Sequence, residues 1–436
     1  MRCINVRAAA LMFAVLAGLL LCSDVAHALD EVEFVSGAKA RGTLKSIDED
    51  KRSVVFEVRI GKRKYTRTYP FDRVRAITVD GKRREISGGS GASSGTTKSG
   101  KPAGGAAASR SEVTALIERV GKTPPEWFDA TPLEYPKTLD LSWPLKPPTK
   151  GWNAQKNMGQ YIWDVVNPNP RRWRSAVRLM HHEMSLHQNN RTLLRRDILT
   201  LAGMYFRLFQ DYPRAAFWYR QARVEKGTGD AVRLAECYWQ LRSKPMALEM
   251  LNNGKLAMNA IKLLGEMGDT RRAIKLAGAF ERINRGPQAN LLAGDACRLA
   301  GRYDEAVRLY RKVVNARNIK NEDYRKRMVA RAQDSITAIK VFEQIDVSKI
   351  ADGKFRSSSV GFVGPIDVEV EVAGGRIVAV RVTKHREKQF YAALEDTPEK
   401  IVAKQSVKGI DATSGATITS QAIVNATAKA LADGAK

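Results

Sequence analysis

The residues best suited to chemistry form one short segment near the C-terminus, from Asp411 to Ser420, with the sequence DATSGATITS. The apolar periodicity of residues 421–432 predicts an amphipathic helix directly after it. A threonine hydroxyl at such a loop-to-helix junction can form a phosphoester, because free backbone N–H groups and the helix dipole favour negative charge there. Gly415 permits a tight turn with no Cβ in the way of a phosphate. The segment is therefore compatible with a phosphate-linked group at the start of the helix.

A plainer interpretation of the same segment is a turn followed by a capped helix. Thr419 or Ser420 would then provide the cap, because short hydroxyl side chains can accept hydrogen bonds from the first backbone N–H groups of a helix. On composition alone this plainer interpretation is favoured.

Three features together make the last part of the chain resemble a known family. They are Gly361-x-x-Gly364-Pro-Ile, the Gly374-Gly375 turn between two alternating strands, and the Asp411–Ser420 segment. All three resemble the FMN-binding domain of the NqrC and RnfG subunits of ion-pumping redox complexes and of exported electron-transfer flavoproteins. The resemblance covers about 85 of the 436 residues.

The resemblance implies a covalent flavin. In that family a flavin transferase uses FAD as donor and attaches FMN through its phosphate to the last threonine of Ser-Gly-Ala-Thr, which is Thr417 here. The neighbouring cofactor-binding positions fall on Asp411, Ser414, Gly415, Ala416, Thr419 and Ser420.

A second short pattern, His385-x-Glu387, resembles the His-x-Glu that often follows the second strand in the family. Here it continues Lys388-Gln389-Phe390 instead of the usual Thr-Pro-Gly. A solvated strand end and a flavin contact therefore both stay open for these two residues.

A flavin domain of this kind relays electrons, since the cofactor steps between one- and two-electron states while the protein fixes its position. No nicotinamide fingerprint, second redox centre or set of catalytic residues is recognised, so an electron carrier is favoured over a self-sufficient oxidoreductase. Its expected partners are a flavin transferase and redox proteins, some of them membrane-bound. The alternative is an interaction scaffold whose flavin domain is vestigial.

The histidine-rich stretch His181-His182-Glu183 with His187 invites a metal interpretation. Metalloproteases place two histidines four residues apart with a glutamate directly after the first, whereas His182 and His187 are five apart. We therefore expect no metal site here. Cys237 and Cys297 lie beside alanines in helical patterns and are expected to be small buried residues.

The elements around these residues begin with a leader. Residues 1–28 combine Arg2 and Arg7, an apolar run to Cys22 and Ala26-His27-Ala28, which is typical of a secretory signal peptide. A retained anchor is the main alternative, and a lipoprotein at Cys22 is disfavoured by the bulky Leu21. We expect an exported protein in the periplasm or another extracytoplasmic space, with membrane association as an option.

The chain then divides into an all-β, an all-α and an α+β part. Short strands in residues 29–85 predict a small SH3- or Sm-like barrel, and the Gly/Ser/Ala-rich residues 86–110 predict a linker. Residues 111–170 are rich in Pro and Trp. We expect this segment to wrap around the next domain, because exposed indole rings would be unfavourable.

Residues 171–345 contain a repeated sequence pattern with one alanine in each copy. These alanines are separated by 32, 26 and 33 residues, and they are Ala215, Ala247, Ala273 and Ala306. Two of these intervals are close to the tetratricopeptide period of about 34. The region resembles a tetratricopeptide-like helical array, which would bind a protein or peptide. Residues 346–436 form the FMN-binding domain of the resemblance.

The amino-acid composition limits the classes of protein to which the whole chain can belong. With 44% hydrophobic residues it can bury a sizeable core, which excludes a disordered chain. Lys and Arg number 73 against 46 Asp and Glu, a net charge of +27. In an exported protein this charge favours anionic envelope surfaces or acidic proteins over nucleic acid, and a polyanion binder remains a third interpretation.

Overall fold

The computed structural model describes residues 30–34, 39–49, 53–60, 63–71, 74–79, 82–86, 107–143, 151, 153–317, 319, 321–342, 344–387 and 392–435. The predicted leader and residues 87–106 of the predicted linker lie outside them. The chain divides into two compact units, residues 1–95 and 96–436. Within the described ranges, no helix has the length and apolarity to cross a bilayer.

The first unit contains one antiparallel sheet with strand order β4-β3-β2-β1-β5-β6. Its strands are β1 (Asp30–Phe34), β2 (Lys39–Asp48), β3 (Ser53–Ile60), β4 (Arg63–Pro70), β5 (Val74–Val79) and β6 (Lys82–Glu85). Strand β2 pairs with β1 through residues 39–42 and with β3 through residues 43–48, and the second pairing has a register shift between Leu44 and Ser46. Val32, Phe56 and Ile77 lie in its buried core. The small N-terminal sheet is confirmed, and the SH3- or Sm-like barrel stays a prediction.

The Pro- and Trp-rich segment opens the second unit. It contains α2 (Arg110–Lys122), an irregular stretch, α3 (Met158–Tyr161), the π-helical turn η2 (Ile162–Val166) and the 3-10 turn η3 (Pro170–Arg172). The Trp127 ring stacks on Phe209 with 5.5 Å between centroids. Trp163, by contrast, is 46% exposed, so the expectation that this ring is covered is wrong: it lies on the solvent side of η2. Trp152 falls outside the described residues.

A helix-rich middle region follows. After α4 (Trp173–Leu186), the helices pack in consecutive pairs. The pairs are α5 (Arg191–Met204) with α6 (Tyr212–Gln221), α7 (Gly229–Gln240) with α8 (Lys244–Leu251), α9 (Ala260–Glu266) with α10 (Thr270–Glu281), and α11 (Gly286–Leu299) with α12 (Tyr303–Val314). The π-helical turn η4 (Tyr205–Phe209) continues α5.

The four repeat alanines all lie near the start of the second helix of a pair, and all are fully buried. A methyl group at this position lets the paired helices approach closely. The helical middle is confirmed, and its membership of the tetratricopeptide class stays a prediction.

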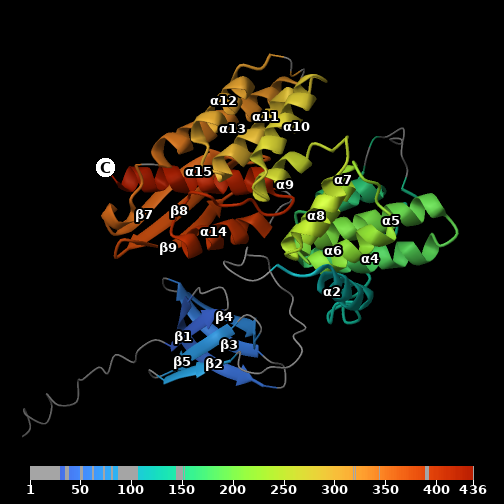
Figure 1. The fold of residues 1–436 in the computed structure, drawn as a ribbon. Coiled ribbons are helices and arrows are strands. Elements are labelled where there is room, and N and C mark those ends of the chain that lie inside the picture. The colour runs from blue at the N-terminus through green and yellow to red at the C-terminus, as the bar shows by residue number, and fades with distance from the viewer. Residues whose placement is uncertain are drawn as a thin grey trace, which may run out of the picture. The chain divides into compact units, whose positions relative to one another are not determined.

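The last part contains β7 (Gly353–Val360), β8 (Pro365–Ala373) and β9 (Arg376–Lys384) in an antiparallel sheet of that order, preceded by the 3-10 turn η5 (Val347–Lys349). The hairpin β8–β9 turns at Gly374 and Gly375, both of which have positive φ. Helix α15 (Thr417–Gly434) packs on β7 and β8, and α14 (Ala392–Lys404) packs on β9 and α15 (Figure 1).

The helical region and this sheet are in direct contact. The long helix α13 (Glu322–Phe342) packs against α12, α15 and β7. The Arg298 guanidinium of α11 donates to Asn425 Oδ1 of α15 over 2.6 Å, and both side chains are buried. The helical array therefore forms part of the support of α15.

Candidate functional site

The predicted attachment residue, Thr417, is the first residue of α15 and is partly buried. The helix N-cap is Ala416, and no side chain caps this end. The expectation that Thr419 or Ser420 caps the helix is wrong, because both lie within its first turn with their side chains directed into the domain. The N-terminus of α15 thus lacks the side-chain acceptor that would otherwise satisfy its first N–H groups.

Thr419 and Ser420 instead fix the surrounding loops. The Ser420 Oγ accepts the backbone N–H of Thr413 over 3.0 Å and the Thr397 hydroxyl over 3.1 Å. The Thr419 hydroxyl donates to Glu387 Oε2 over 2.6 Å. These bonds hold the 411–416 loop and the end of the hairpin against the first turn of α15.

Glu387 is 2% exposed, so the strand-end interpretation of this residue is wrong. Its Oε1 accepts the N–H of Val363 over 3.0 Å, and a Cβ on Gly361 would lie 2.7 Å from that oxygen. The carboxylate therefore joins the glycine loop 361–364 to the N-terminus of α15 through Thr419. His385 is partly buried beside it.

The glycine loop has a second support from the helical region. The Arg331 guanidinium of α13 donates to the carbonyl oxygens of Gly361 and Phe362, with distances of 2.9 Å from Nη2 to each. Burial lowers the pKa of Arg331 to about 10, and Glu387 acts in the opposite direction. No sequence signal marks Arg331 as part of the site, because it lies outside the motif on a different helix.

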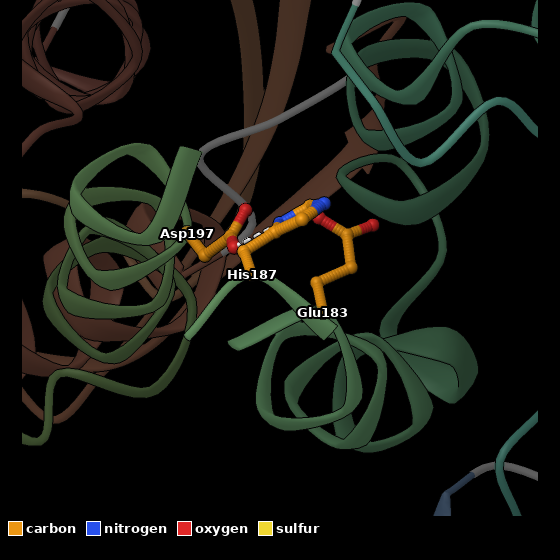
Figure 2. Close-up of side chains that lie close together, drawn as sticks. All are labelled: Glu183, His187 and Asp197. Carbon is orange, nitrogen blue, oxygen red and sulfur yellow. Dashed lines mark hydrogen bonds and ion pairs between the residues drawn. The ribbon is translucent and has the colours of Figure 1, made fainter. Parts of the chain in front are cut away.

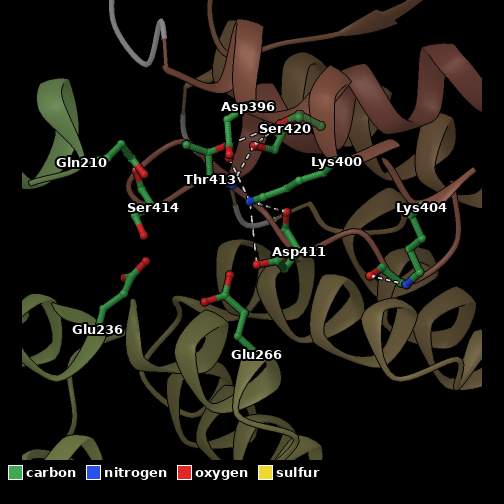
Figure 3. A network of polar contacts seen from close by, with 12 residues as sticks. Gln210, Glu236, Glu266, Asp396, Lys400, Lys404, Asp411, Thr413, Ser414 and Ser420 are labelled. Atoms are coloured by element: carbon green, nitrogen blue, oxygen red, sulfur yellow. Dashed lines mark hydrogen bonds and ion pairs between the residues drawn. The ribbon is translucent and has the colours of Figure 1, made fainter. Parts of the chain in front are cut away.

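The acidic position of the motif, Asp411, belongs to a small charged network around Lys400 (Figure 3). The Lys400 Nζ lies 2.8 Å from Asp396 Oδ2 and 3.7 Å from Asp411 Oδ2. Burial alone would lower the pKa of Lys400, but the two aspartates raise it above its ordinary value. Lys400 thus stays charged and ties the loop to α14.

The helical array reaches the motif from the other side. The Gln210 amide, just after η4, donates to the Ser414 carbonyl over 3.4 Å. Gly415 has φ +73°, and a Cβ built on it would lie 3.0 Å from Arg207 Cγ of η4. A glycine is therefore required here both for the turn and for the close approach of η4.

Figure 3 places Glu236 and Glu266 of the array below Ser414 and Asp411. Lys262 pairs with both glutamates, at 2.6 Å and 2.9 Å. Burial is the main cause that raises the pKa of Glu266, to about 7, with Glu236 and Asp411 adding to it and Lys262 opposing it. The motif thus faces a buried group of two glutamates paired with Lys262, which the sequence could not show because these residues are far apart along the chain.

One comparison with known proteins locates a family on this part of the chain. Residues 361–432 match the family model of the FMN-binding domain. An uncharacterized protein of Treponema pallidum (strain Nichols) is 37% identical over 86 residues, which are 19% of this chain and 24% of the relative. The match thus spans about a quarter of that relative's length. No solved structure matches.

The residues present fit an FMN phosphate. The uncapped end of α15 offers backbone N–H groups, and the partly buried Thr417 offers a hydroxyl at the first helical position. Ser414 Oγ is buried and has no hydrogen-bond partner among the described residues. A buried hydroxyl without a partner costs about 1–3 kcal/mol, and a phosphate oxygen held at this loop would supply one. FMN is the cofactor that this domain supports.

Proposed function

We propose that the chain is an exported flavoprotein that carries FMN as a phosphoester on Thr417 and relays electrons between extracytoplasmic or membrane redox partners. The observation that carries the proposal is the position of Thr417. It is the first residue of a helix without a side-chain cap, within the segment that matches the FMN-binding domain.

The attachment is a group transfer that a flavin transferase would catalyse with FAD. The Thr417 Oγ forms a bond to the phosphorus of the FMN half, the diphosphate bond of FAD breaks, AMP leaves, and the hydroxyl proton passes to solvent. The uncapped N–H groups of α15 stabilise the phosphate charge, because the positive end of the helix dipole lies there. Gly415, with φ +73°, permits the tight turn that precedes Thr417.

Once attached, FMN supplies the redox chemistry. The chain holds the attachment loop in one conformation. Glu387, Arg331 and Ser420 fix the loops on either side of the N-terminus of α15. Gln210 and Arg207 fix the motif from the array. A covalent bond also prevents loss of the cofactor outside the cytoplasm, where free flavin is scarce.

In this proposal the helical array and the N-terminal sheet dock the redox partners. A scaffold with a vestigial flavin domain is the second candidate. The burial of Ala412, Thr413 and Ser414 favours this second candidate, because a buried motif is less accessible to a transferase. The two candidates differ in one property, because only the first carries flavin when a transferase is available.

The experiment is co-expression of the full chain with and without a flavin transferase, followed by a denaturing gel read by flavin fluorescence. Wild type should give a fluorescent band only with the transferase. Thr417→Ala should lose the band, Thr417→Ser should retain one, and Thr383→Ala, an exposed threonine of the same domain, should match wild type. Flavin at full stoichiometry on Thr417→Ala would overturn the attachment, and a colourless wild type would favour the scaffold.

A further inference from the structure

A second group of reactive side chains lies in the helical region, apart from the flavin motif. Glu183 and the C-cap residue His187 stand at the end of α4, and Asp197 comes from α5. One ligand atom of each lies within 4.8 Å of the others, and all three side chains are buried. Figure 2 shows the Glu183 carboxylate pointing toward the imidazole of His187, with Asp197 bonded to the ring.

The contacts around this group orient it. His187 Nδ1 lies 2.6 Å from Asp197 Oδ2. The indole N–H of Trp143 donates to Glu183 Oε2 over 2.7 Å and to Asp197 Oδ1 over 2.8 Å. Arg196 holds the tryptophan by donating to its carbonyl over 3.0 Å. The indole thus uses one oxygen of each carboxylate and fixes the direction of the other.

The second carboxylate oxygen of Glu183 is not used by these contacts. Glu183 is 0% exposed, and its Oε1 has no hydrogen-bond partner in the part of the chain that the structure describes. A buried carboxylate oxygen without a partner is costly, and the nearby carboxylate of Asp197 adds repulsion. Either a proton on Glu183 or a bound cation must compensate.

We propose that Glu183, His187 and Asp197 bind a divalent transition-metal cation of the Zn²⁺ type. Two carboxylates and a neutral imidazole balance a double positive charge. This mixed oxygen and nitrogen set suits Zn²⁺ or Co²⁺, whereas Mg²⁺ and Ca²⁺ prefer oxygen alone. Ligand bonds to Zn²⁺ are about 2.0–2.2 Å, so atoms within 4.8 Å of one another need only small side-chain movements to converge.

Trp143 then has the role of an outer residue that orients the ligands. Hydrogen bonds from outside the metal sphere hold ligating carboxylates in place in known sites. The cation would join the end of α4, α5 and the segment that carries Trp143, which are otherwise linked here by the indole and the imidazole. The metal ion would have a structural role, and this proposal does not depend on whether the chain binds flavin.

The first experiment uses the tag-free full chain, treated with a chelator and then titrated with Co²⁺ and Zn²⁺. We expect one equivalent of metal by elemental analysis, visible Co²⁺ absorption bands, quenching of tryptophan fluorescence by Co²⁺, and a higher melting temperature with Zn²⁺. A chain that retains no metal after dialysis and shows no change in melting temperature would overturn the proposal.

The variants distinguish a site that binds a metal ion from a cluster of side chains that only stabilises the fold. Glu183→Gln resembles the protonated glutamate, so it should fold without metal while binding Zn²⁺ at least 100-fold more weakly than wild type. Trp143→Phe should weaken binding about 10–100-fold. His182→Gln, a neighbour in the same helix, should bind like wild type. Equal Zn²⁺ affinity in Glu183→Gln and wild type would contradict the assignment.

Discussion

Two pairs of carboxylates in this molecule are neutralised in different ways. Asp396 and Asp411 share the ammonium group of Lys400, so the chain itself supplies the positive charge. Glu183 and Asp197 share the indole N–H of Trp143, and Asp197 also bonds to the imidazole of His187. The Oε1 atom of Glu183 has no hydrogen-bond partner within the described residues. The comparison indicates that the first pair is complete as it stands, whereas the second needs a proton or a metal ion.

The largest effect should appear in the pH dependence of the metal-free protein. Burial raises the pKa of Glu183 from 4.5 to about 9, so the folded chain binds a proton that the unfolded chain releases. The stability from this proton is complete below pH 4.5 and is lost as the pH rises to 9. Urea denaturation in chelator should show wild type losing stability, on the order of a few kcal/mol, relative to Glu183→Gln across this window. Parallel curves for the two proteins would mean that Glu183 is ionised in the fold.

The next effect concerns the pair that the chain neutralises itself. Lys400→Met leaves Asp396 and Asp411 without their shared cation, and both are about a quarter exposed. Breaking a fully buried pair costs about 3–5 kcal/mol, so partial exposure reduces the expected loss to about 2 kcal/mol. The exposed Lys404→Met is the control and should change the free energy of unfolding little. A Lys400→Met protein as stable as this control would remove the difference between the two clusters.

The smallest effect tests how closely the array covers the motif. Gly415→Ala and Gly374→Ala both force alanine into a positive-φ conformation, but only the Cβ at position 415 meets another part of the chain, Arg207 Cγ at 3.0 Å. Gly415→Ala should therefore be about 1 kcal/mol less stable than Gly374→Ala by urea denaturation. Equal losses would show that η4 yields to the extra methyl group and that the cover over the motif is loose.

Local patterns predicted much of the fold. The alternating residues 366–372 and 376–383 predicted the hairpin that became β8 and β9, and the glycines between them predicted its turn. The repeat alanines predicted a helical array, and all four are buried. Strands β6 and β7 were not predicted. Strand β7 contains three consecutive serines, whose low strand propensity hides an edge strand that α13 and α15 cover.

The sequence predicted only those parts of the site that come from residues adjacent along the chain. Its motif follows from adjacent residues, whereas the helix expected over residues 421–432 begins at Thr417. The cap was assigned wrongly because tertiary contacts turn Thr419 and Ser420 inward. Arg331 and Gln210 reach the site from separate helices and leave no mark on the motif. Spacing along the chain also could not show that Asp197 lies beside Glu183 and His187, because Asp197 comes from the next helix.

The most direct test of the central claim is the intact mass of the purified chain after co-expression with a flavin transferase. We expect the polypeptide mass plus that of FMN less one water, and fragmentation that places the addition on Thr417. A mass equal to the polypeptide alone, or an addition on another residue, would contradict the account.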